Sequence, residues 1–129
     1  MLAQLEDRPG RVVVVDLGGG VMTVARGDST EIDVLVVVVE PYPRSIEVAR
    51  RLLDMAAQKG LDRRVVVANK VEGPEDLALI GNLLGVEPDL VIPDDRSVRA
   101  ADREGASPLD YDAGSPALSV LRDLASSLI

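Results

Sequence analysis

The most regular feature of the sequence is a set of short apolar runs in which valine predominates. These runs occupy residues 11–16, 33–40, 64–69 and 89–93. Within each run apolar residues follow one another instead of alternating with polar ones, which is typical of strands buried on both faces of a parallel sheet. The pattern therefore predicts about four strands in a mostly parallel sheet.

Segments with helical periodicity separate these runs. Over residues 43–59, apolar side chains recur three or four positions apart, and Gly60 is placed to end the helix. Residues 73–84 begin with Gly-Pro and two acids, a typical helix start. We also expect a final helix from Ser115–Pro116, a short helix over residues 95–103, and the tail of another helix at residues 1–7.

Strands and helices alternate along the chain, which predicts an α/β fold with a mostly parallel sheet flanked by helices. The length of 129 residues suits one domain spanning residues 1–129. Ligands of such sheets bind beyond the carboxyl ends of the strands. The predicted strands end at Asp16, Glu40, Asn69 and Pro93.

Composition and charge exclude several classes of function. The formal net charge of -8 argues against partners with phosphate backbones and against anionic membrane surfaces, so we expect no nucleic acid and no membrane. The sequence has no Cys and no His, which excludes disulfides, thiolate metal sites and His-based catalysis. Lack of Cys fits a cytoplasmic protein. No signal-peptide pattern precedes the first run, and the apolar runs are too short to span a bilayer.

A glycine-rich stretch, Gly18 to Gly20, follows the first predicted strand and its last residue, Asp16. An acid at this place can position Mg²⁺ or a water molecule in front of a switch loop. A tight turn after a buried strand explains the same residues, because glycine is common wherever the backbone turns sharply. The loop after the second strand, residues 40–45, is either a rigid connection or a loop that approaches a nucleotide or a partner subunit.

The pair Asn69–Lys70 closes the third predicted strand. Asn can donate and accept hydrogen bonds at the edge of a purine, and the aliphatic stem of Lys can pack on the base. Guanine-specific proteins usually carry an Asp two residues after this Lys, whereas Glu72 stands here. A turn-forming Asn beside a solvated Lys accounts for the pair equally well.

Two acids follow the fourth predicted strand, which ends at Pro93. Asp94 or Asp95 is expected to cap the following helix, because Asp is a favoured residue at helix N-termini. The two acids do not indicate a hydrolase, since no second catalytic group is apparent nearby.

The sequence lacks a phosphate-binding loop. The pattern G-x-x-x-x-G-K-[ST] requires a Gly-Lys pair, and the two lysines here, Lys59 and Lys70, follow Gln58 and Asn69. Phosphoryl transfer without that loop loses its main electrostatic support. We therefore expect no ATP hydrolysis by this chain alone.

From about residue 10 onward, the ordered set of motifs resembles the later half of ParA/MinD-type (SIMIBI-class) P-loop ATPases. The resemblance is strongest to the nucleotidase family that assists nickel insertion during maturation of carbon monoxide dehydrogenase. Its motifs are Arg26-Gly27, Val37 to Pro41 with Ser45, Asn69 to Val71, Ile92 to Asp94 with Val98, Ala101 to Gly105, and Ser115 to Ala117.

This resemblance implies a truncated P-loop-NTPase-like (Rossmann-like) three-layer sandwich. It implies that Asp16 lies near the Mg²⁺ ion and the γ-phosphate. It also implies that four residues surround the adenine of ATP or ADP, namely Asn69, Lys70, Pro93 and Asp94. Paired cysteines with which such maturation factors could hold metal between subunits are absent, so nickel handling is not supported.

The resemblance also bears on partners. In this family the strand that leads into the phosphate loop is central in the sheet, so its absence either exposes an edge or forces a new strand order. Exposed sheet edges pair with other chains. We therefore expect a homo-oligomer or a protein partner that pairs at this edge.

We favour a non-catalytic ParA/MinD-like module that acts in regulation or assembly. Two alternatives stay open: half of a split ATPase completed by a partner chain, and a weak adenine-nucleotide-binding protein. A receiver-like domain is disfavoured, because receivers cluster acids at the first strand and place a Lys near the end of the sheet, and this pattern is absent here.

Overall fold

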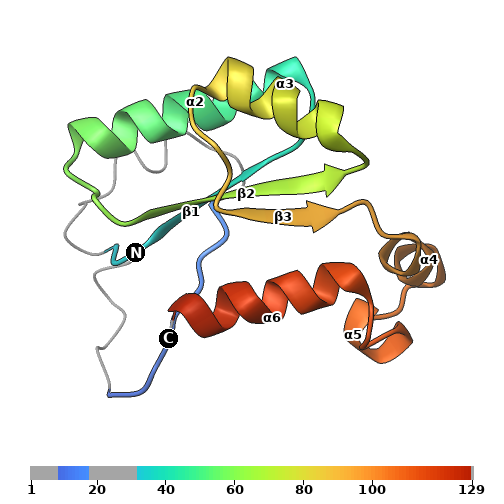
Figure 1. The fold of residues 1–129 in the computed structure, drawn as a ribbon. Helices are drawn as coiled ribbons and strands as arrows, with labels where there is room; N and C mark the ends of the chain where they lie inside the picture. The colour runs from blue at the N-terminus through green and yellow to red at the C-terminus, as the bar shows by residue number, and fades with distance from the viewer. Residues whose placement is uncertain (1–8, 18–31, 129) are drawn as a thin grey trace.

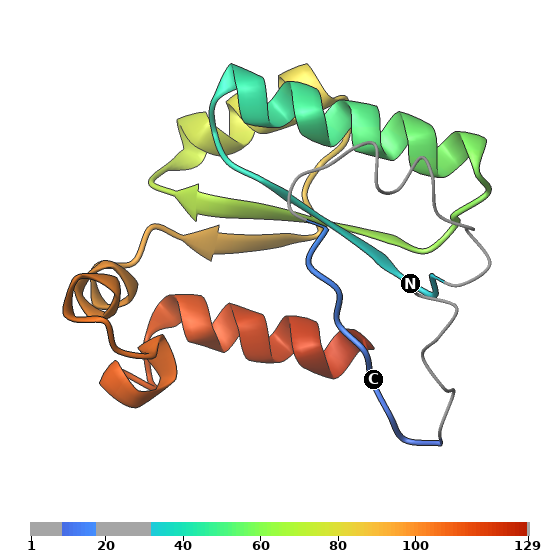
Figure 2. The same cartoon turned by 180° about the vertical axis from the view of Figure 1, so that it is seen from behind.

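The computed structural model describes residues 9–17 and 32–128, which contain a three-stranded parallel sheet with the order β1-β2-β3. The strands are β1 (Leu35–Val39), β2 (Arg64–Val71) and β3 (Leu90–Pro93). Helices α2 (Pro43–Gln58) and α3 (Pro74–Leu84) cover one face, and α6 (Pro116–Leu128) covers the other (Figures 1 and 2). This arrangement confirms the predicted α/β fold with a parallel sheet between helical layers.

The larger core lies between the sheet and the helices α2 and α3. Ile46 of α2 and Ile80 of α3 are 2% and 0% exposed, and both pack against the buried side chains of β1 and β2. Both helices begin with Pro at the first or second position, whose fixed φ suits a first helical turn. Gly85 ends α3 with a φ of 81°, a left-handed conformation that glycine adopts without strain.

The opposite face is only partly covered. Val67, Ile92 and Ala117 form a small core beneath α6, which packs mainly on β3. Val36 of β1 reaches this core, whereas Val38, on the same face of the strand, is 56% exposed. The prediction that every strand is buried on both faces is therefore wrong for β1, although it holds for the middle of β2, where Val66, Val67 and Ala68 are all buried.

The predicted strand over residues 11–16 is not a strand. In the described part of the chain, residues 11–17 lack regular secondary structure, and Val12, Val13, Val14 and Val15 are 57%, 44%, 89% and 39% exposed. Valine-rich composition favours a strand only where a neighbouring strand completes the backbone hydrogen bonds. The described residues place no such neighbour beside this segment, so the sheet has three strands and not the predicted four.

The helices agree closely with their predicted spans. The short predicted helix is α4 (Arg96–Glu104), and a further helix, α5 (Pro108–Tyr111), was not predicted. Both stand beyond the carboxyl end of β3 (Figure 1). Three expectations lie outside the described residues: the helix tail at residues 1–7, the glycine-rich stretch at 18–20, and the motif at 26–27. None of the helices in the described part is long and apolar enough to cross a membrane.

Candidate functional site

The carboxyl end of β2 is irregular where Asn69 and Lys70 lie. Ala68 pairs with Val91 and Val71 pairs with Pro93, so β2 contains one more residue than β3 between these two pairs. Lys70 has a φ of 56°, the left-handed conformation that side chains other than glycine rarely adopt. Bulges of this kind re-aim side chains and are common beside functional sites. With this irregularity, β2 continues to Val71, two residues beyond the end predicted at Asn69.

The side chain of Lys70 links the ends of the first two strands. Its Nζ lies 2.9 Å from Oε1 of Glu40, the residue that follows β1. The hydrogen bond and the negative charge of Glu40 raise the pKa of Lys70 above its usual value. The backbone N–H of Glu40 donates to Ser45 Oγ over 2.9 Å, which fixes the loop between β1 and α2. The loop at residues 40–45 therefore meets the end of β2.

A cavity of about 550 Å³ opens beyond the ends of β2 and β3. This volume lies within the range of about 300–1,000 Å³ that is usual for small-molecule sites. Charged residues of both signs and three apolar residues line it. They are Lys70, Glu72, Asp94, Val98, Arg99, Asp102, Ala106 and Pro108.

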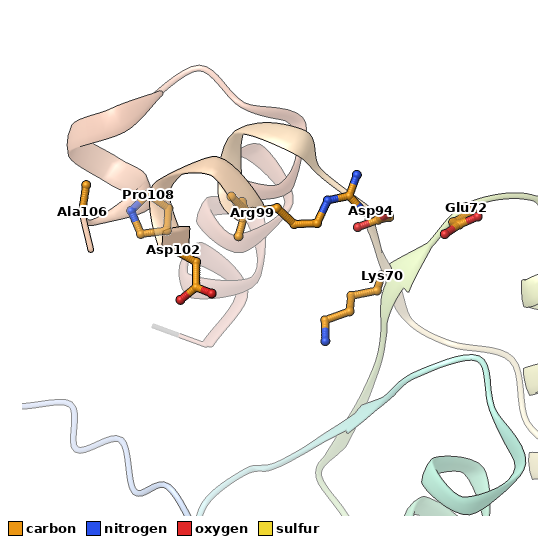
Figure 3. Close-up of a pocket in the computed structure, with 8 residues that line it drawn as sticks. Lys70, Glu72, Asp94, Arg99, Asp102, Ala106 and Pro108 are labelled. Carbon is orange, nitrogen blue, oxygen red and sulfur yellow. Dashed lines mark hydrogen bonds and ion pairs between the residues drawn. The ribbon is translucent and has the colours of Figure 1, made fainter. Parts of the chain in front are cut away.

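Asp94, at the end of β3, forms an ion pair with Arg99 of α4. Figure 3 shows Arg99 extending from the helix towards Asp94, while Lys70 and Asp102 extend into open space on the other side of this pair. Arg99 thus holds the carboxylate of Asp94 at the rim of the cavity.

Asp95 positions the wall of the cavity. Its Oδ1 accepts from the N–H of Ser97 at 2.8 Å, and its Oδ2 accepts from the N–H of Ala117 at 3.1 Å. One carboxylate therefore caps the N-termini of both α4 and α6, and the bond from Ala117 is the main cause that lowers the pKa of Asp95. Of the two acids predicted to cap a helix, Asp95 is the one that does so.

The structure brings together two of the five predicted site residues. Lys70 and Asp94 line the same cavity. Asn69 and Pro93 are half-buried in the adjacent strand ends and do not line it. Asp16 is exposed in the irregular segment before Leu17, and it is not part of the lining. Their roles towards adenine and Mg²⁺ stay predictions.

A metal site is not evident among the described residues. Residues 9–17 and 32–128 contain no group of three or more acidic, His or Cys side chains that could together hold an ion.

Two functional candidates were missed in the sequence. Arg99 and Asp102 lie three residues apart on α4 and face the same cavity as Val98. Their spacing indicates a shared helix face, but which side of that helix meets β2 depends on how the chain packs after Pro93.

Comparisons with known proteins agree with the motif-based resemblance. No protein-family model matches the chain. The chain is similar to the carbon monoxide dehydrogenase accessory protein CooC of Rhodospirillum rubrum, with 33% identity over 123 residues that cover 91% of this chain. It is also similar to an uncharacterized ATP-binding protein of Methanocaldococcus jannaschii, with 27% identity over 117 residues that cover 88% of this chain. These homologues support an ATP-binding, P-loop-type family.

The chain spans less than half of either relative, 43% of the first protein's length and 45% of the second's. The activity of a whole relative therefore does not transfer to this chain by similarity alone.

Proposed function

We propose that this chain is a non-catalytic ParA/MinD-like module that binds an adenine nucleotide through its base and acts in regulation or assembly with a protein partner. The observation that carries the proposal is the cavity beyond the carboxyl ends of β2 and β3, the place where parallel α/β sheets bind ligands. Similarity to a protein described as ATP-binding supports the choice of nucleotide.

The charges around the cavity suit a base better than a phosphate. Its lining carries two cations, and both are already paired: Lys70 with Glu40 and Arg99 with Asp94. Glu72 and Asp102 also line the cavity, and neither side chain has an ion pair within the described part of the chain. The uncompensated charge of the lining is therefore negative. It favours an uncharged base with N–H donors inside the cavity, and it repels the phosphates, which would point towards solvent.

Hydrolysis by the isolated chain is not part of the proposal. The 129 residues contain no Gly-Lys pair, and backbone amides of a phosphate loop together with its Lys provide the main stabilisation in phosphoryl transfer. A partner that supplied such a loop would make the assembly a split ATPase. Mg²⁺, for which Asp16 is the proposed ligand, would then bind with the phosphates.

Calorimetric titration of the full chain with ADP and ATP, with and without Mg²⁺, tests nucleotide binding. We expect a dissociation constant in the micromolar range that Lys70→Ala and Asn69→Ala weaken. Lys59→Ala is the matched control, because Lys59 lies at the end of α2 and outside the cavity lining. No measurable heat at millimolar nucleotide would refute base binding by this chain.

The uncovered edge of the sheet supports a protein partner. Within residues 9–17 and 32–128, no strand pairs with the outer edge of β1, and Val38 is 56% exposed beside it. Unpaired strand edges are sites of association. We expect a strand from another chain to pair with this edge of β1.

Light scattering at micromolar concentration tests this association. We expect a dimer or larger species for the isolated chain, and Val38→Lys should shift it towards the monomer, because it places a charge on the open face. Val86→Lys is the control, since Val86 is 45% exposed in the connection between α3 and β3. A monomeric wild-type chain would argue against self-association and would direct the search to a different polypeptide.

A further inference from the structure

The cavity contains a carboxylate that the fold itself does not use. Asp102 lies in the second half of α4, and its side chain forms no hydrogen bond or ion pair within the described residues. A negative charge near a helix C-terminus is opposed by the helix dipole. No hydrogen bond or ion pair within the described residues therefore stabilises the charge of Asp102.

Apolar side chains line the cavity next to Asp102, and such a surface can pack against the face of a flat ring. Val98 of α4, Ala106 of the connection after it and Pro108, the first residue of α5, supply apolar surface. Val98 and Asp102 are four residues apart and therefore lie on one face of the helix. Figure 3 shows Lys70 reaching towards the same open space from β2.

Glu72 is the other uncompensated carboxylate of the lining, but its position is less suited to the ring. In Figure 3 it lies on the far side of Asp94 from Asp102, away from the apolar wall. A base that packs against Val98 and Pro108 would present its edge to Asp102.

We propose that Asp102 is a specificity-determining residue whose carboxylate accepts a hydrogen bond from the exocyclic amino group of adenine. This inference rests on the proposed function, and it adds the group that selects the base. An ionised carboxylate only accepts hydrogen bonds, so it favours an amino group and disfavours a carbonyl oxygen at the same ring position. Hydrogen bonds to charged groups are stronger than neutral ones.

The test compares ADP with IDP, in which a carbonyl oxygen replaces the amino group. Calorimetry on the full wild-type chain should give ADP binding about ten times tighter than IDP binding, the order expected for one hydrogen bond to a charged group. In Asp102→Asn the carboxamide can accept from an amino group or donate to a carbonyl oxygen, so the ratio should fall to about one or reverse.

Asp110→Asn is the matched control, because it removes the same charge from an exposed residue of α5 outside the lining. This variant should keep the wild-type ratio of ADP to IDP affinity. Thermal unfolding of both variants checks that they fold, and Asp102→Asn should be no less stable than wild type, since the native charge opposes the dipole of α4.

Each outcome has a distinct meaning. An ADP to IDP ratio that Asp102→Asn leaves unchanged would refute the role of Asp102 while leaving nucleotide binding intact. Tighter binding of GDP than of ADP, lost in Asp102→Asn, would overturn the assignment to adenine and indicate that the carboxylate contacts the N–H groups of guanine. Absence of binding by all three nucleotides would refute the proposed function and this inference with it.

Discussion

Asp95 is predicted to contribute more to stability than any other charged residue near the cavity. Its two carboxylate oxygens accept hydrogen bonds from the N–H groups of Ser97 and Ala117, so it caps α4 and α6 together. Loss of one N-cap costs about 1 kcal/mol, and loss of a negative charge at a helix N-terminus costs about 0.3–1 kcal/mol more. With two helices affected, Asp95→Ala should lower the free energy of unfolding by about 2–4 kcal/mol.

Urea unfolding followed by circular dichroism measures this change. For a small domain, a loss of that size moves the urea midpoint by about 1–3 M. Asp95→Asn should lose roughly half as much, because the amide retains one oxygen for one helix and removes the charge. Asp123→Ala, an exposed change on α6, is the control and should stay within about 0.5 kcal/mol of wild type.

The pH dependence gives a second check on the same residue. Hydrogen bonds from Ala117 and Ser97 lower the pKa of Asp95 below its ordinary value of 3.8 in the folded state. A lowered pKa means that the ionised carboxylate stabilises the fold above the unfolded value, and this contribution disappears as pH falls through the folded pKa. The difference between wild type and Asp95→Ala should therefore be constant from about pH 7 to pH 5 and should shrink below the ordinary pKa. A loss under 0.5 kcal/mol, or one independent of pH, would refute the double cap.

Three further predictions concern the strand ends and the core. Lys70→Gly should be about 1 kcal/mol more stable than Lys70→Ala in urea unfolding, because residue 70 has a φ of 56°; equal stabilities would contradict a left-handed backbone there. Glu40→Gln should bring the pKa of Lys70 down towards 10.5 in an NMR titration, and an unchanged pKa would show that the ion pair does not form in solution. Ile80→Ala should lower the free energy of unfolding in urea by about 2–5 kcal/mol, since Ile80 is fully buried, whereas Val38→Ala should lower it much less. Similar losses for the two variants would contradict the position of the core.

Local sequence patterns were sufficient for most of the fold. The three apolar runs that became strands and the helices between them carry their own signals, namely continuous or periodic apolar residues, Pro at helix starts and Gly at helix ends. The helix α2 begins at Pro43 as predicted and ends at Gln58, one residue from the expected end. Such features depend on residues close in the chain, so one sequence shows them.

The candidate site was only partly predictable, because it depends on contacts between distant residues. Lys70 and Asp94 stand at strand ends, where the fold class alone indicates ligand sites. Arg99 and Asp102 join them only because α4 packs beyond β3 with one particular face towards β2. Likewise, the capping of α4 by Asp95 follows from its position next to the helix, whereas its bond to Ala117, 22 residues away, does not.

The valine-rich segment 11–16 shows where local composition stops being sufficient, and it also supports the proposed partner. Val12 to Val15 and Val38 are between 39% and 89% exposed, so on average somewhat more than half of these side chains is in contact with water. Complete burial of a valine is worth about 1.5–3 kcal/mol, so covering these five side chains would contribute roughly 5 kcal/mol. That amount is comparable to the stability of a whole small domain, and part of it offsets the entropy lost on association. A strand from a partner would satisfy the open backbone edge of β1, and a partner surface that covered these valines would add this burial. We therefore expect the segment 11–16 to become a strand only where an assembly supplies a neighbouring strand.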